Sequence, residues 1–245
     1  TNGEVTFELF PAGQVGTDIV GAMESGLLDV GVVISGRQPD LFPLTAVGEL
    51  PQGAANACEG SSRMWQLTQA GGVLNDLEFA PNGLHVVSAH MLAPYVLYTR
   101  GVAINSLADV SGLKIWASGP AAEQAIAAIG GVPIRIPSTE LYDAASRGTV
   151  DGAVFPYSGL IQYNLPPILD NVVEGVNFGS GVFFLTFSEG AWGGLTEEQQ
   201  QIVQEEAQAA QGAFCTYIDE SNAAQRAEVA AVDGYTVVDL EGDAL

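Results

Sequence analysis

Residues that could perform catalysis are few in this chain, and their spacing argues against the common mechanisms. His85 and His90 would lie on opposite faces of a strand, or about 140° apart on a helix, so they are not placed to share a metal ion. Ser111 and Lys114 fit the S-x-x-K motif of serine β-lactamases, but those enzymes also need a K-T-G element, and Lys114 is the only lysine. No nucleophile elbow, zinc-protease motif, phosphate loop or dinucleotide fingerprint is present. These absences argue against an enzyme, and we expect neither a metal nor a cofactor.

The two cysteines, Cys58 and Cys215, are too few for a metal cluster or a disulfide framework. Small, polarizable cysteine side chains commonly fill apolar cores. We therefore expect two buried or free thiols, and the alternative is one long-range disulfide.

The charge balance restricts the partners of the chain. Its 245 residues include 7 Lys plus Arg and 29 Asp plus Glu, which gives a net charge of −22. Nucleic acids and anionic membrane surfaces both require a basic face, so neither is an expected partner. Apolar residues make up 47% of the chain, enough for a sizeable core, but no run reaches the roughly 18 residues of a membrane span. We expect an acidic monomer without direct membrane insertion.

Short apolar runs alternate with helical stretches bounded by Gly and Pro, which is typical of α/β units. The continuous run at 28–34 predicts a strand covered on both faces. Pro120 suits a first helical position, and Ser138 is placed to cap another helix. The expected strands are 5–10, 28–34, 84–88, 95–99, 114–117, 134–136 and 149–155, and the expected helices begin near 17, 62, 120 and 138.

The C-terminal part predicts one unusually long helix. Thr196 and Gln199 form a capping box, and no proline interrupts the chain from there to Val232. A helix over about 197–231 would be about 50 Å long, more than the width of one small lobe. We therefore expect two α/β lobes bridged by this helix, with a ligand cleft between them. Lobe I would comprise 1–90 and 180–212, and lobe II 91–179 and 213–245.

A series of short motifs runs in order along nearly the whole chain. The motifs are Phe10-Pro11-Ala12-Gly13-Gln14-Val15-Gly16, Gly26-Leu27-Leu28-Asp29, Glu49-Leu50-Pro51, Gly112-Leu113-Lys114-Ile115, Gly131-Val132-Pro133, Ile136-Pro137, Glu140-Leu141-Tyr142, Gly148-Thr149-Val150-Asp151-Gly152 and the turn Leu195 to Gln199. Together they resemble the substrate-binding proteins of TRAP transporters, the DctP-type family.

This resemblance implies a two-lobed fold like that of periplasmic binding proteins. It also implies a periplasmic receptor without enzymatic activity, which captures a small organic solute and delivers it to the permease subunits of a TRAP transporter. Members of the family usually begin with a further strand and helix, so we expect a first lobe that is shortened at its N-terminus.

Two positions depart from the family pattern. In most relatives the residue two after the conserved lysine is an arginine that pairs with a substrate carboxylate, and here that position is Trp116. A second position, often asparagine, is Phe155, and Tyr157 follows it closely. Arg100 and Arg135 do not occupy matching positions. Because an anion loses a strong forked contact without its arginine, the usual organic acid becomes a doubtful ligand.

The sequence instead favours a small amine or ammonium compound. A desolvated ammonium over a Trp face gains about 2 kcal/mol, and Glu49 is the candidate counter-charge. Tyr95 and Phe183 lie on segments expected to cross between the lobes, and they complete the predicted ligand-binding set. The alternatives are a carboxylate, a neutral polar or an aromatic solute, or a ligand-sensing module or an enzyme on the same scaffold.

Overall fold

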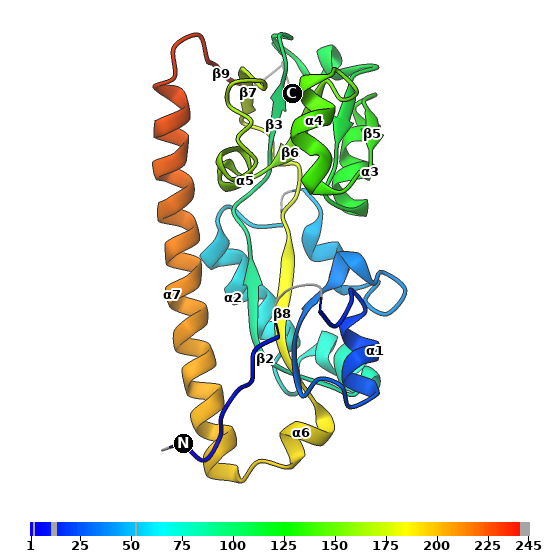
Figure 1. Cartoon of the computed structure of the whole chain (residues 1–245), viewed down its shortest axis with the longest axis vertical. Helices are drawn as coiled ribbons and strands as arrows, with labels where there is room; N and C mark the ends of the chain where they lie inside the picture. The colour runs from blue at the N-terminus through cyan, green and yellow to red at the C-terminus, as the bar shows by residue number, and fades with distance from the viewer. Residues whose placement is uncertain (2, 11–13, 52, 241–245) are drawn as a thin grey trace.

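The computed structural model describes residues 1, 3–10, 14–51 and 53–240, which form two α/β lobes beside one long helix (Figure 1). The predicted two-lobed architecture is therefore confirmed. Residues 11–13 of the motif from Phe10 to Gly16 lie outside the described part of the chain.

Lobe I contains a three-stranded antiparallel sheet in the order β1-β8-β2. Its core is aromatic, because the ring of Phe79 packs 4.9 Å from that of Phe42 and 4.8 Å from that of Phe184. Its elements are α1 (Ile19–Glu24), β1 (Val30–Ile34), α2 (Ala57–Thr68), β2 (Leu84–Met91), β8 (Val182–Ser188) and α6 (Glu189–Gly193).

Lobe II contains a six-stranded mixed sheet in the order β5-β4-β6-β3-β7-β9. Strand β4 runs parallel to β5 and β6, whereas β3 runs antiparallel to β6 and β7. Apolar side chains bury both faces of this sheet. Its elements are β3 (Val96–Thr99), β4 (Lys114–Trp116), α3 (Pro120–Ala128), β5 (Val132–Ile134), α4 (Leu141–Ser146), β6 (Gly152–Phe155), α5 (Tyr157–Gln162), β7 (Asn171–Glu174) and β9 (Thr236–Asp239).

The long helix α7 spans Glu197–Ala230, 34 residues, and runs along both lobes (Figure 1). Its predicted capping box is confirmed: Thr196 Oγ1 accepts from the N–H of Gln199, whose side chain accepts from the N–H of Thr196. Among the described residues, no helix has both the length and the apolar composition needed to cross a membrane.

Lobe I holds α7 through glutamine side chains and a β-bulge. The register of β2 shifts between Val86 and Ser88, and the carbonyl of Val87 accepts hydrogen bonds of 2.8 Å from both Gln204 and Gln208. One turn further along, Gln211 accepts from the N–H of Ala89 at 2.9 Å. The first half of the helix is therefore fixed to β2.

The contacts of α7 change from lobe I to lobe II between Asp219 and Asn222. Asp219 accepts from the backbone at the start of α2, whereas Asn222 accepts from the N–H of Tyr157 in lobe II. Arg226 then pairs with Glu174 of β7. The lobe boundaries expected from the sequence, 212/213 in this helix among them, stay predictions.

The expectation of two free thiols is wrong. Cys58, in the first turn of α2, forms a disulfide with Cys215 of α7, and their Cα atoms are 4.7 Å apart. The two helices pack side by side here, because Asp219 also bonds to the N-terminal turn of α2. The alternative of one long-range disulfide is the correct one.

Two strand predictions in lobe I need correction. Residues 5–10 form no strand, and Leu9 is 87% exposed, because no described strand lies alongside to pair with them. Strand β1 is present but is not covered on both faces. It forms one edge of its sheet, and Val32 is 47% exposed.

Local differences elsewhere have local causes. Helix α2 starts at Ala57, earlier than predicted, because Asn56 caps it by accepting from the N–H of Glu59 at 2.8 Å. Ser138 lies within a short 3₁₀ turn and does not cap α4. Strand β5 includes Pro133, which is tolerated because β5 is an edge strand.

Candidate functional site

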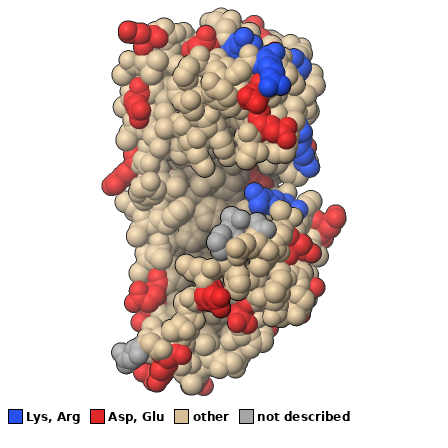
Figure 2. Space-filling view, viewed as in Figure 1, with Lys and Arg blue, Asp and Glu red and all other residues tan. Residues whose placement is uncertain are grey.

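A pocket of about 260 Å³ lies between the two lobes, where the surface is hollowed in Figure 2. Each lobe supplies one wall, and the two segments that cross between the lobes supply the rest. The lining residues from lobe I are Ile34, Gly36, Arg37 and Glu49; those from the crossing segments and the start of β8 are Leu92, Tyr95, Phe178, Ser180, Gly181, Val182 and Phe183; and those from lobe II are Ser118, Gly119, Ala121, Ala122 and Tyr163.

The crossing segments are bonded to each other. The N–H of Tyr95 donates to Gly179 at 2.9 Å, and the N–H of Phe178 donates to the carbonyl of Tyr95 at 3.0 Å. Gly179 has a φ of +106°, and a Cβ there would lie 2.3 Å from the carbonyl oxygen of Glu49. Only glycine permits this close approach. The base of the pocket is thus held in place by backbone contacts.

Glu49 supplies a buried carboxyl group to the pocket. The residue is 7% exposed, and its Oε1 accepts from Ser35 Oγ and from the N–H of Gly36, both at 2.9 Å. Burial raises the pKa of this carboxyl, although the two hydrogen bonds act in the opposite direction. No basic side chain among the described residues forms an ion pair with it.

Arg37 is the one basic residue among those that line the pocket. It follows β1 directly, in a short 3₁₀ turn, and its side chain is exposed. Within the described part of the chain it forms no ion pair with a carboxylate. The opposite wall carries the start of α3, capped by Gly119 without a side-chain bond. This helix end adds a partial positive charge facing the same pocket.

Tyr95 and Phe183 line the pocket as aromatic surfaces. Burial raises the pKa of Tyr95 to about 12, and the nearby carboxyl of Glu49 adds to this shift, so the hydroxyl stays protonated as a donor. Phe183 stacks on His90, with ring centres 5.1 Å apart, and contacts Phe214 of α7 edge to face. Three of the six predicted residues therefore meet here: Glu49, Tyr95 and Phe183.

Trp116, Phe155 and Tyr157 do not line this pocket. Trp116 is 5% exposed, and its indole N–H donates to the carbonyl of Ile136 at 2.9 Å. Phe155 packs against Trp116 and against Tyr163, which does line the pocket. The hydroxyl of Tyr157 donates to Glu174. These predicted residues belong to the core of lobe II, and Phe155 lies behind the pocket wall.

The lining residues that the sequence did not indicate include Arg37, Ser118 and Tyr163. Arg37 had a usable signal, because a Gly-Arg pair directly after an apolar strand places a cation at the strand end. The two arginines considered earlier lie elsewhere: Arg135 pairs with Glu123, and Arg100 lies beside Gly148. Ser118 and Tyr163 had no distinguishing pattern.

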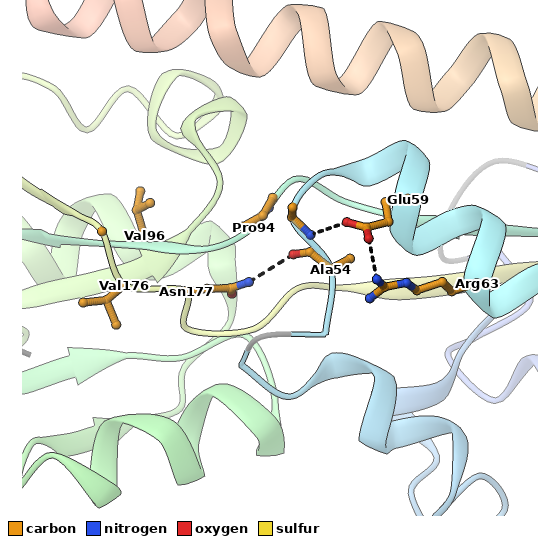
Figure 3. A pocket seen from close by; sticks show the side chains of 9 residues that line it. Ala54, Glu59, Arg63, Pro94, Val96, Val176 and Asn177 are labelled. Atoms are coloured by element: carbon orange, nitrogen blue, oxygen red, sulfur yellow. Dashed lines mark hydrogen bonds and ion pairs between the residues drawn. The ribbon is translucent and has the colours of Figure 1, made fainter. Parts of the chain in front are cut away.

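A larger hollow of about 480 Å³, the outer hollow, lies against the other side of the crossing segments and is lined by residues such as Glu59, Arg63 and Asn177 (Figure 3). Its polar groups already have partners. Glu59 pairs with Arg63 and accepts from the N–H of Ala55, and Asn177 donates to the carbonyl of Ala54. The smaller pocket, with two charged groups that form no ion pair with any described residue, is the stronger candidate for a ligand site. No described group of His, Cys, Asp and Glu could hold a metal ion.

Comparisons with known proteins identify the family of the chain. The family profile of DctP, the bacterial extracellular solute-binding protein family 7, matches residues 1–244. The chain belongs to this family. A curated solute-binding protein of Roseobacter denitrificans is 23% identical over 254 residues, covering 100% of this chain and 74% of the relative.

Two solved TRAP solute-binding proteins share the fold. One from Bordetella bronchiseptica, with bound mandelate, is 25% identical with a TM-score of 0.84, covering 100% of this chain and 77% of its own. One from Rhodoferax ferrireducens, with copurified benzoate, is 23% identical with a TM-score of 0.80, and the match covers 98% of this chain and 75% of its own.

Family membership answers several questions raised by the sequence. The DctP-family chain is a periplasmic solute-binding receptor of the TRAP type and not an enzyme. Its partners are those of the family, a small-molecule ligand and a TRAP membrane permease.

Proposed function

We propose that this receptor binds a small carboxylate with an apolar or aromatic body in the pocket between its lobes. The observation that carries this proposal is Arg37, a guanidinium that lines the pocket without an ion-pair partner among the described residues. A guanidinium fork matches the two oxygens of a carboxylate, and a charge-assisted pair of this kind is among the strongest polar contacts in proteins.

The remaining surfaces of the pocket suit the rest of such a ligand. Phe183, Phe178 and Leu92 offer apolar contact, and the hydroxyls of Tyr95, Tyr163 and Ser118 can form hydrogen bonds. The relative from Bordetella bronchiseptica, which carries mandelate, supports an aromatic acid as the ligand class. The amine favoured by the sequence loses its main support, because Trp116 lies in the core of lobe II.

The net charge of −22 does not oppose this proposal. Charges separated by more than about 8 Å are largely screened at physiological ionic strength, so the nearest groups decide the local potential. In this pocket they are Arg37, the start of α3 and Glu49, whose carboxyl pKa is raised by burial. The monomeric state expected from the sequence stays a prediction.

A comparison of acids with their neutral amides tests the proposed ligand class. Mandelate and benzoate should raise the melting temperature, because a ligand at 100 times its dissociation constant stabilises the folded state by about 2.7 kcal/mol. For a chain of this length that is a shift of about 5–10 °C. Mandelamide, benzamide and benzylamine should give much smaller shifts. Equal shifts from the amides or from benzylamine would contradict the proposal.

Replacement of Trp116 by phenylalanine separates a core role from a ligand role. We expect the free energy of unfolding to fall by about 1–3 kcal/mol, because the carbonyl of Ile136 loses its donor and the packing around Phe155 loosens. The affinity for mandelate should stay within about twofold of the parent value, because Trp116 does not line the pocket. Calorimetric titration measures this affinity. A tenfold loss of affinity in a variant of normal stability would return Trp116 to the ligand site.

A further inference from the structure

Two opposite charges line the same pocket of about 260 Å³ without pairing with each other. Arg37 lies at its exposed margin and Glu49 at its buried side. No ion pair joins Arg37 or Glu49 to any described residue. A carboxylate ligand would satisfy Arg37 and leave Glu49 without a counter-charge.

The carboxyl of Glu49 has one oxygen available. Its Oε1 takes both described hydrogen bonds, from Ser35 and Gly36, and Oε2 accepts none from the described residues. The space beside Oε2 is kept open by a glycine, since a Cβ at Gly36 would lie 2.5 Å from this oxygen. A buried carboxylate is costly unless it is paired and hydrogen-bonded, so a donor on the ligand would relieve this cost.

We propose that the preferred ligand is a zwitterion, an amino acid whose carboxylate pairs with Arg37 and whose ammonium donates to Glu49 Oε2. This inference rests on the proposed function and adds a second polar contact to it. An ammonium fits this position better than a hydroxyl, because it supplies both the hydrogen bond and the missing positive charge. Glu49 then determines specificity, and Arg37 provides the anchor common to all acids.

Three ligands that differ in one substituent test the proposal. Phenylglycine, mandelate and phenylacetate share a phenyl ring and a carboxylate, and carry an ammonium, a hydroxyl and a hydrogen at the same carbon. Calorimetric titration of the full chain should show phenylglycine binding at least about tenfold more tightly than phenylacetate, one strong polar contact being worth at least 1.4 kcal/mol. Mandelate should fall between the two.

The variant Glu49→Gln should remove this preference. Glutamine keeps an acceptor for Ser35 and Gly36 but has no charge, so phenylglycine should lose about tenfold in affinity while phenylacetate changes by less than about threefold. Glu59→Gln, at the outer hollow, serves as the matched control and should keep the parent order of affinities. Circular dichroism and the melting temperature of both variants show that they are folded.

The possible failures are distinct. If the acids bind but phenylglycine is no tighter than phenylacetate or mandelate, the zwitterion proposal is wrong and the carboxylate receptor stands. A preference for phenylglycine that persists in Glu49→Gln also overturns the role of Glu49. If none of the three binds, the proposed aromatic-acid function itself fails.

Discussion

Replacement of Arg37 by glutamine is expected to weaken the binding of mandelate by about 100-fold or more. When bound mandelate covers the guanidinium, removing this partner of the buried, hydrogen-bonded charge pair should cost about 2–5 kcal/mol, because the ligand's carboxylate is left in the pocket without a counter-charge. Arg37 is the only basic residue among the described lining of the pocket, so no neighbour can replace it. Calorimetric titration of parent and variant with mandelate measures the change.

The control for this variant is Arg63→Gln. Arg63 is also an arginine of lobe I, but it lines the outer hollow, pairs with Glu59 and donates to the carbonyl of Gly53. The variant Arg63→Gln should bind mandelate with an affinity within about twofold of the parent value. If Arg37→Gln binds mandelate as tightly as the parent, the carboxylate is held elsewhere and the proposed anchor is wrong.

Reduction of the disulfide is expected to lower the free energy of unfolding by about 3–5 kcal/mol. Cys58 and Cys215 are 157 residues apart, and a bridge that closes so long a loop strongly restricts the unfolded chain. At roughly 2–4 °C per kcal/mol, the melting temperature should fall by about 10 °C. Urea unfolding with and without a phosphine reductant measures the difference.

A double variant, Cys58→Ser with Cys215→Ser, provides the control. It should match the reduced parent in stability and should not respond to reductant. Ligand affinity should change little, because neither cysteine lines the pocket. If the parent shows the same unfolding midpoint with and without reductant, the bridge is absent from the protein in solution or contributes nothing to its stability.

Elements with strong local signals were predictable from the sequence. The capping box at Thr196 and the long stretch without proline defined α7 to within one residue of its end. Whether a segment pairs as a strand, and which place it takes in the sheet, was not predictable in this way. The apolar alternation of residues 5–10 is typical of a strand, but a strand also needs a neighbour, and pairing is a property of the whole sheet. The continuous apolar run in β1 likewise says nothing of its place at an edge.

The candidate site was predictable in part. Tyr95 and Phe183 could be placed because they lie on segments that must pass between two lobes, and Glu49 because it directly precedes the Leu-Pro motif. Trp116 does not line this pocket, because the face that a strand residue presents depends on distant partners. The carbonyl of Ile136, 20 residues later, accepts its indole N–H. The disulfide was also beyond the sequence, since the packing of α2 on α7 brings its two cysteines together.

The way in which α7 is held limits how the lobes can close on a solute. A hydrogen-bonded helix cannot stretch, and α7 is attached to lobe I by Gln204, Gln208 and a covalent bridge at Cys215. A rotation of lobe II toward lobe I would therefore have to bend the helix between Asp219 and Asn222, or break its contacts with lobe II, such as the pair of Arg226 with Glu174. Such a deformation would consume part of the energy released when a ligand binds, so the affinity for a solute would be lower than its contacts alone would give.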